Sequence, residues 1–355
     1  MSDILRSFFY SLVVVDTSAT ADQLVETLLK QTSIVTFSNA KLTGDSACAG
    51  IYTQGKESYD GLNKDNGIVL STGNAADLPN QDSSRSSTAF GAPKDTQMQS
   101  FVEAEYNLPV PGYPKTGDAC VLEFDFVCEQ DPCPIVFNYI FGSEEYSSSS
   151  QTFNDAFAWF LNDKNIALLP ADPNDPYANE NQQPVVNIKN VNANTNSRFY
   201  KDNNPNASEK AYPHLEANGF TTVLQAIGLV NGGETNHMKM VITDVADIGY
   251  DSWVMLEAES FGPDINPCEV GCGKPQQQSH KVEVCHHASN ANQVTICIDR
   301  NALEKHLLLH GDFCGKCPGD EKRGKSSLGD SGAMSRIATV ASALAATAAA
   351  MFFME

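Results

Sequence analysis

Short strand-like runs alternate with clusters of turn-forming residues between Ile34 and Phe261. The clearest is VLEFDFV, Val121 to Val127, in which apolar residues alternate with Glu123 and Asp125, as in a strand with one buried face. The other runs are Ile34–Phe37, Gly67–Ser71, Ile135–Phe141, Ala156–Leu161, Phe220–Ile227, His237–Thr243 and Ser252–Phe261. Because no helical pattern separates these runs, the sequence predicts antiparallel strands in a β-sandwich or jelly-roll-like domain.

One helix is expected near the N-terminus. The stretch ADQLVETLLK, Ala21 to Lys30, places leucine and valine at helical spacing, and Thr20 precedes it as a capping residue. Upstream, the apolar residues from Ile4 to Val15 fit two interpretations. They form either a secretory signal that is cleaved near Ala19-Thr20-Ala21, or a first strand over Leu12 to Val15. The expected fold is therefore mainly β with one N-terminal helix.

Charge and cysteine content restrict the possible functions. The net charge is -21, and because phosphate binding needs clustered lysine and arginine, no nucleic-acid partner is expected. This acidity fits an ordinary soluble surface, or carboxylates that bind divalent ions in a cation-rich medium. Six of the ten cysteines lie between Cys268 and Cys317, which indicates an oxidising compartment. The sequon Asn206-Ala207-Ser208 is compatible with a secreted glycoprotein.

Two acidic loops form a candidate calcium site. Calcium prefers several oxygen ligands from flexible loops, so the two loops would bind one ion if the strands bring them to one edge of the sandwich. The alternative is that these carboxylates are simply solvated. The candidate ligands are Glu144, Glu145, Asp155, Asp244, Asp247 and Asp251, with Asn154 beside them.

Glu144 and Glu145 fit poorly as a catalytic pair. A glycosidase needs two carboxyl groups that converge on one bond from opposite sides. Neighbours on an extended strand point to opposite faces, and in a turn both can point to water. No catalytic residue is therefore assigned, and the protein is not expected to be an enzyme.

An ordered series of motifs resembles the choice-of-anchor L domain family. The motifs are VTFSNAKLTG, GIVLSTGNAAD, ACVLEFDF, FNYIFGSEEY, FNDAFAWFL, GFTTVL and DSWVMLEAESF, spread between about Leu12 and Gly262. The resemblance implies an extracellular β-rich module of secreted and surface proteins that carry differing C-terminal anchors. It implies no established catalytic activity and no agreed ligand.

The chain departs from the family pattern in its long Asn-rich loops and in four extra cysteines. Cys128 and Cys133 are close enough in sequence to close a hairpin disulfide, and Cys48 and Cys120 are a candidate pair across the sandwich. The strand FNDAFAWFL is also similar to a strand of legume-type lectins, in which an aspartate at the position of Asp155 supports sugar and calcium binding. The more ordinary interpretation is that the aromatic residues of this strand belong to the core.

The segment from Val282 to Cys317 is expected to form a small Cys/His module. It resembles a cassette near the C-terminus of many secreted bacterial proteins, whose function is not settled. Cysteine and histidine are the usual ligands of structural zinc, and the candidate ligands are Cys285, His306, His310, Cys314 and Cys317. The alternative is disulfides, such as Cys285–Cys317 and Cys297–Cys314, with Cys268 and Cys272 paired together or upstream.

The C-terminal residues Ile337 to Met354 are apolar and rich in alanine. Small residues at Ser331-Gly332-Ala333 and a polar stretch before them suggest a glycolipid-anchor signal, although the spacer is short and the chain ends on Glu355. A single membrane-spanning helix and an alanine-rich soluble helix are the alternatives. The expected divisions are a β domain over 1–263, a linker over 264–281, the Cys/His module over 282–317, a polar linker over 318–336 and the tail over 337–354.

These features together predict a protein on the outer face of the plasma membrane, anchored by its tail. The expected role is binding or adhesion to extracellular glycans or matrix, supported by calcium. The Cys/His module is expected to hold structural zinc. A secreted structural or matrix protein without a specific ligand is the second hypothesis, and an extracellular hydrolase is the third.

Overall fold

The structure is a computed structural model of the whole chain. It describes residues 13–30, 34–59, 61–79, 86–105, 115–129, 133–147, 154–169, 183–204, 206, 211–246, 248–262, 272, 281–287, 293–299, 302, 306 and 313–314.

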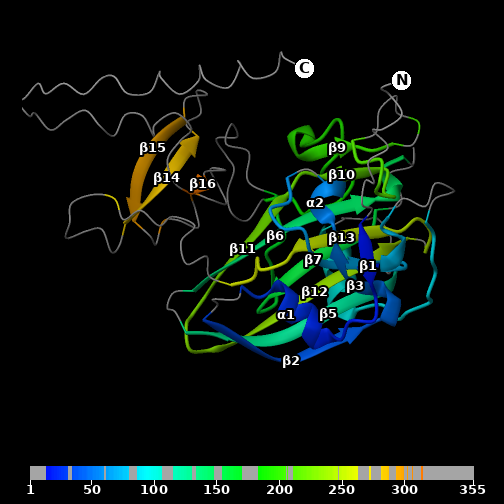
Figure 1. Cartoon of the computed structure of the whole chain (residues 1–355), viewed down its shortest axis with the longest axis horizontal. Coiled ribbons are helices and arrows are strands. Elements are labelled where there is room, and N and C mark those ends of the chain that lie inside the picture. The colour runs from blue at the N-terminus through cyan, green and yellow to red at the C-terminus, as the bar shows by residue number, and fades with distance from the viewer. Residues whose placement is uncertain are drawn as a thin grey trace, which may run out of the picture. The chain divides into compact units, whose positions relative to one another are not determined.

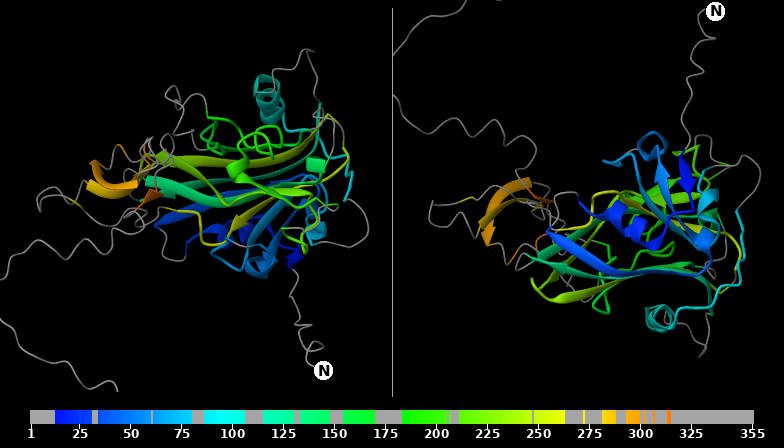
Figure 2. Two further views of the ribbon diagram at one scale, coloured as in Figure 1. Left: turned by 90° about the horizontal axis from the view of Figure 1, so that it is seen from above. Right: turned by 60° about the horizontal axis from the view of Figure 1, so that its bottom comes forward.

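Two antiparallel sheets form the large domain (Figures 1 and 2). The eight-stranded sheet has the order β1-β3-β4-β13-β6-β10-β9, and β11 also pairs with β6. Its strands are β1 (Val14–Asp16), β3 (Ala49–Thr53), β4 (Gly67–Ser71), β6 (Cys133–Ser143), β9 (Tyr200–Asp202), β10 (Gly219–Thr221), β11 (Leu224–Val230) and β13 (Ser252–Glu257). The five-stranded sheet has the order β2-β5-β12-β7-β8. Its strands are β2 (Val35–Thr43), β5 (Thr116–Cys128), β7 (Ala156–Leu161), β8 (Lys164–Asn165) and β12 (Thr235–Val245). The predicted mainly β, antiparallel sandwich is confirmed.

Aromatic side chains from both sheets meet in the core. Phe137 of β6 packs against Trp159 of β7, with ring centroids 4.6 Å apart, and stacks on Phe261 at 4.7 Å. All three are fully buried. Because alternate residues of a strand point to the same face, the runs VLEFDFV and FNDAFAWFL each supply one inward row to this core. The aromatic residues of FNDAFAWFL were interpreted as part of the core, and this is confirmed for Phe157 and Trp159, which are buried.

The N-terminal helix α1 (Ala21–Leu28) forms as predicted. Thr20 accepts a hydrogen bond from the backbone N–H of Gln23, whose side chain accepts one from the N–H of Thr20, so both ends of a capping box are present. Leu24, Val25 and Leu28 are buried. Two further helices, α2 (Gly55–Ser58) and α3 (Thr96–Glu105), were not expected from the sequence. The apolar stripe of α3 is narrow, with Met98 and Val102 as its buried apolar members, so its period is hard to recognise.

One predicted strand is two strands in the structure. The run Phe220–Ile227 divides into β10 and β11, which pair in succession with β6. The run Gly67–Ser71 and the run Ala156–Leu161 have the predicted bounds. Residues Val14–Asp16 form β1, which pairs with β3, so this part of the N-terminal apolar stretch is a strand.

A three-stranded sheet forms the Cys/His module, in the order β15-β14-β16. Its strands are β14 (Lys281–His287), β15 (Gln293–Asp299) and β16 (Phe313–Cys314). Val282, Val284 and Ile298 form its small apolar core.

Three disulfides join described cysteines. Cys48–Cys120 and Cys128–Cys133 are the two pairs suggested for the β domain. Cys297, however, pairs with Cys272, so the suggested Cys297–Cys314 bridge is wrong. In the register of the small sheet, Cys297 is opposite Glu283, whereas Cys314 is opposite Val284.

Candidate functional site

Strand register brings four acidic loop ends to one end of the sandwich. In the eight-stranded sheet Ser143, the last residue of β6, is opposite Ser252, the first of β13. In the five-stranded sheet Thr243, near the end of β12, is opposite Ala156, the first of β7. The residues that flank these positions are acidic, and together they form what we call the acidic cluster: Glu144, Glu145, Asp155, Asp244 and Asp251.

Glu144 and Glu145 are both buried. They begin a 3-10 turn over Glu144–Ser147, directly after β6, and each side chain is 1% exposed. The sequence had suggested that such neighbours diverge on a strand or point to water in a turn. They lie in a turn, and their burial contradicts the expectation that they point to water.

Asp155 links the two sheets. Its backbone N–H donates to the Glu145 Oε2 atom at 2.9 Å. Its own Oδ1 accepts from the N–H of Val245 at 3.2 Å, and its Oδ2 accepts from the Ser252 hydroxyl at 2.7 Å. The buried carboxyl group thus contacts β12 and β13, which belong to different sheets, and the backbone N–H contacts the turn after β6.

The segment 86–92 covers the outer side of the acidic cluster. The N–H of Ser86 donates to the Glu144 Oε1 atom at 2.9 Å, and the N–H of Thr88 donates to the Asp251 Oδ1 atom at 3.0 Å. The N–H of Phe90 donates to Asp118 at 2.9 Å. Every second amide of the segment therefore binds a carboxylate. Sequence reasoning missed this segment and Asp118, because the sequence SSTAFGA carries no charge that marks it as an anion-binding segment.

Gly73 allows Asp251 to enter the cluster. A Cβ atom at this position would lie 2.1 Å from the Asp251 Oδ2 atom, closer than any side chain can approach. Only glycine therefore fits beside this carboxylate.

Two polar side chains inside the cluster have unsatisfied atoms. Asp244 is 2% exposed and Asn154 is fully buried. Within the described residues, the Asp244 Oδ1 atom and both polar atoms of the Asn154 side chain have no hydrogen-bond partner. A buried polar atom without a partner costs about 1–3 kcal/mol, so this arrangement is unfavourable unless a ligand satisfies it.

Burial also raises the pKa of these carboxyl groups. The pKa of Glu144 rises to about 9, first because of burial and second because its side chain hydrogen-bonds with Glu216. Burial raises the pKa of Asp155 well above its usual range, and repulsion by Glu145 and Asp244 adds to this. The pKa values of Asp244 and Asp251 are raised mainly by burial too. Lys189 interacts electrostatically with Glu145, but one ammonium group does not balance the cluster.

The cluster can hold protons or a cation. Without a cation, buried carboxyl groups remain protonated near neutral pH and share hydrogen bonds. A divalent ion would convert the same mutual repulsion into attraction, and carboxylate and amide oxygens are the ligands that calcium prefers. Among the described residues, no group of three or more His, Cys, Asp or Glu side chains has the arrangement of a preformed metal site. A bound ion would therefore have to draw these oxygens together.

Asp247, the sixth candidate calcium ligand, lies outside the described residues. Among the candidate zinc ligands, Cys285 is disulfide-bonded, and the rings of His306 and His286 are 5.7 Å apart. His310, Cys317 and the side chain of Cys314 are outside the described residues. Because zinc binds the thiolate form of cysteine, a site that includes Cys285 requires reduction of this disulfide. The zinc site stays a prediction.

The two antiparallel sheets define a β-sandwich module. Residues 13–262, most of the chain, match the choice-of-anchor L domain family, and the chain belongs to this family, which indicates a surface-associated β module. No curated protein and no solved structure matches it significantly. In the part of the chain that the structure describes, no helix is long and apolar enough to cross a membrane, and the tail 337–354 lies outside that part.

Proposed function

We propose that this protein is a cell-surface binding or adhesion module in which a calcium ion organises one end of the β-sandwich. The observation that carries the proposal is the acidic cluster, in which Asp155 connects both sheets and Asp244 retains an unsatisfied buried oxygen. A calcium ion at this position would fix the adjoining loops and so hold a ligand-binding surface in one conformation.

Binding is favoured over hydrolysis by the burial of the cluster. A raised carboxyl pKa is typical of active sites, and Glu144 has one. A catalytic acid, however, must come within hydrogen-bond reach of its substrate. Glu144, Asp155 and Asp244 are at most 2% exposed, so no substrate touches them in this conformation.

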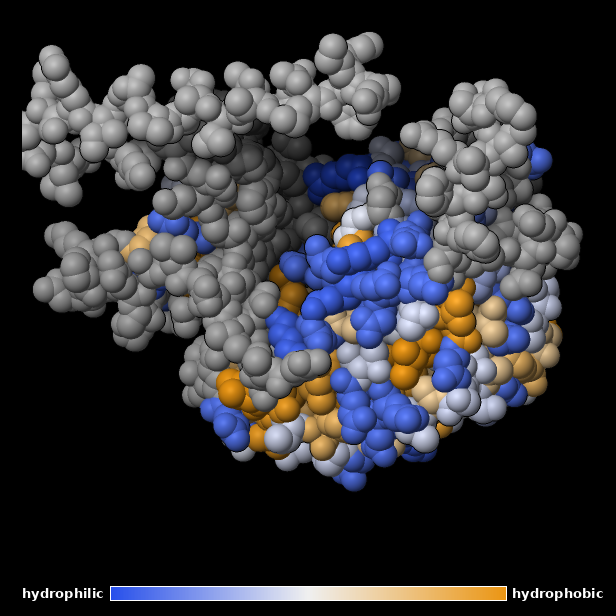
Figure 3. Space-filling view, viewed as in Figure 1, coloured by the Kyte–Doolittle hydropathy of each residue, from blue (hydrophilic) through white to orange (hydrophobic). Residues whose placement is uncertain are grey.

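The surface chemistry agrees with a binding role outside the cell. The face seen in Figure 3 is dominated by hydrophilic residues, with apolar areas scattered between them. The large exposed apolar residues of the described part, Val14, Leu229, Ile248 and Val294, come from separate segments of the chain. We propose extracellular glycans or matrix as the ligands, since an acidic, polar surface suits hydrogen bonding to hydroxyl groups.

A glycan array and a panel of immobilised matrix proteins test the ligand class. We expect the calcium-loaded protein to bind at least one of these surfaces and to release it when a chelator is added. Equal binding with and without chelator would contradict the role of calcium. A folded, calcium-loaded protein that binds no surface would favour a structural matrix role instead.

We further propose that residues 337–354 anchor the protein to the outer face of the plasma membrane. Their apolar composition supports this, and a glycolipid anchor and a membrane-spanning helix are both compatible with it. A phospholipase that cleaves glycolipid anchors would release the protein from intact cells in the first case only. Recovery of the full-length protein in the culture medium, without enzyme treatment, would contradict anchoring.

A further inference from the structure

Strand β11 has an exposed edge that carries none of the usual protection. It pairs with β6 on one side, and within the described residues no strand pairs with its other side. Its sequence, LQAIGLV, contains no charge and no proline, and its register with β6 is unbroken. Such an edge presents unpaired backbone N–H and C=O groups to any strand that approaches.

The other edge strands of the two large sheets are protected. β1 and β9 have three residues each and β8 has two, which is too short to pair stably with a partner. β2 is long, but it is interrupted by a bulge between Ser38 and Lys41 and carries the charge of Lys41. Among the described edge strands of the two large sheets, β11 alone is long, regular and uncharged. Natural proteins avoid such edges unless something pairs with them.

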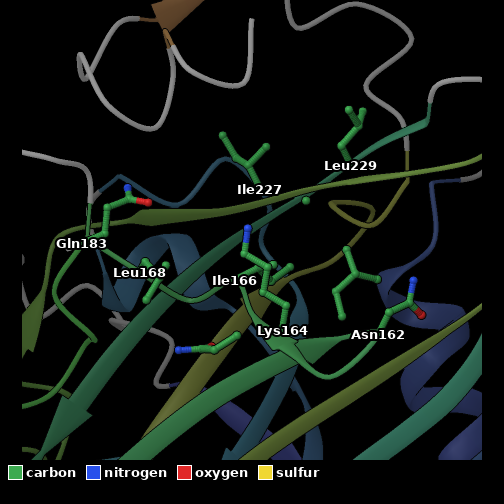
Figure 4. A pocket seen from close by; sticks show the side chains of 10 residues that line it. Asn162, Lys164, Ile166, Leu168, Gln183, Ile227 and Leu229 are labelled. Carbon is green, nitrogen blue, oxygen red and sulfur yellow. The ribbon is translucent and has the colours of Figure 1, made fainter. Parts of the chain in front are cut away.

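A pocket of about 270 Å³ adjoins this edge (Figure 4). β11 supplies Ile227 and Leu229, and the β7–β8 hairpin with the residues after it supplies Leu161, Ile166 and Leu168. This volume is at the lower limit for a site that holds a free small molecule, but it suits an aliphatic side chain of a larger ligand. Leu229 is 49% exposed, so its side chain is available for contact.

Two polar side chains of the pocket, Lys164 and Asn165, offer hydrogen-bond donors. Lys164 is exposed, and Figure 4 shows it at the centre of the pocket. The Asn165 Oδ1 atom accepts from the N–H groups of Trp159 and Ala167, at 2.9 Å and 3.1 Å, which fixes the amide group. Its Nδ2 atom is buried and, in the described part of the chain, has no acceptor. No aspartate or glutamate lines the pocket. The missing group is therefore an acceptor, and beside Lys164 an anionic acceptor is the best complement.

We propose that β11 and this pocket bind an extended peptide segment of a partner protein. The segment adds as a strand along β11, places an aliphatic side chain in the pocket and directs a carboxylate to Lys164 and Asn165. Backbone hydrogen bonds supply affinity in this mode, and the pocket supplies specificity. A second copy of the chain fits less well, since its own β11 carries no carboxylate. The site is independent of the acidic cluster and of calcium.

Two fluorescein-labelled heptapeptides test the proposal on the full-length protein by fluorescence anisotropy. Both begin with alternating threonine and valine, followed by leucine. The acidic peptide ends in aspartate, and the basic peptide ends in lysine amide. We expect the acidic peptide to bind about tenfold more tightly than the basic one, as a charge-assisted contact implies. Lys164→Glu should reverse this preference, a result that loss of folding cannot produce.

Leu229→Lys is the second variant, because a lysine on an edge strand opposes strand addition. We expect this substitution to weaken the binding of the acidic peptide about tenfold or more. Val14→Lys is the matched control, since Val14 is 55% exposed on the edge strand β1, and it should leave binding unchanged. Equal affinity for the two peptides, an unaltered affinity in Leu229→Lys, or no binding at about 1 mM protein would overturn the proposal. Self-association that Leu229→Lys abolishes, without peptide binding, would assign the edge to a second copy instead and would also overturn it.

Discussion

Stripped of divalent ions, the protein is expected to melt at a lower temperature at pH 8 than at pH 5. The pKa of Glu144 is about 9 in the folded state, against 4.5 for an ordinary glutamate. A carboxyl group whose pKa is higher in the folded than in the unfolded state stabilises the fold below its unfolded pKa, and this contribution is lost as the pH rises through the folded pKa. For Glu144 the free energy of unfolding therefore falls by up to about 1.4 kcal/mol per pH unit between 4.5 and 9.

Other members of the acidic cluster act in the same direction. Burial raises the pKa of Asp155, Asp244 and Asp251, so each of them also binds a proton more tightly in the folded state. Calcium should reverse the trend, because it binds the deprotonated carboxylates and competes with the protons. At about 100 times its dissociation constant, a ligand that binds only the folded state adds about 2.7 kcal/mol of stability. We expect this gain at pH 8 and little of it at pH 5.

Thermal unfolding followed by circular dichroism measures both effects. Metal-stripped protein is compared across this pH range with and without calcium chloride, at an ionic strength kept constant with sodium chloride. The sodium control matters because the net charge of -21 also destabilises the fold at high pH by general repulsion, which salt screens. A melting temperature that rises from pH 5 to pH 8 in the absence of calcium would contradict the account, as would a calcium effect of equal size at both pH values.

Asp244→Asn is expected to stabilise the metal-free protein at pH 8 and to abolish its response to calcium. The substitution keeps the shape of the side chain but removes a carboxyl group that burial and neighbouring carboxylates keep from ionising, and keeping that proton at pH 8 costs folding free energy. We expect the free energy of unfolding in denaturant to rise by about 1–3 kcal/mol without calcium. With calcium the variant should show no gain, because the oxygen that lacks a partner in the wild-type protein no longer carries charge.

Glu105→Gln is the matched control for this variant. It removes the same charge from an exposed position at the end of α3. We expect its stability to change by less than about 0.5 kcal/mol and its calcium response to equal that of the wild-type protein. If Asp244→Asn instead lowers stability in both conditions, the carboxyl group has a structural role that no cation explains.

Much of the fold was predictable because it depends on local alternation of side chains. Gly67–Ser71 and Ala156–Leu161 were correctly bounded, since apolar runs between turn residues have few other solutions. Helix α3 was missed because its apolar stripe is narrow, with Met98 and Val102 as its buried apolar members. The Cys272–Cys297 disulfide was missed because pairing depends on strand register and chain path, which spacing in the sequence does not reveal.

The candidate site was predictable in its residue types but not in its environment. Loop carboxylates at Glu144, Asp155 and Asp244 were recognised as possible ligands, and register brings their strand ends together as expected. Their burial was not foreseen, because it depends on the coverage that the segment 86–92 and both sheets provide. Acidic residues in turns are usually solvated, so no local pattern distinguishes a buried cluster from a solvated one. The β11 edge was equally hidden, since the sequence does not show which strand lies at an edge.

Isothermal titration of calcium into the metal-stripped protein at pH 8 tests the central claim most directly. The account predicts saturable binding at one site, accompanied by proton release, since the ion displaces protons from the cluster. It also predicts that Asp244→Asn abolishes this binding while Glu105→Gln retains it. Absence of saturable binding to the folded wild-type protein, or equal binding to Asp244→Asn, would show that the acidic cluster is not a calcium site.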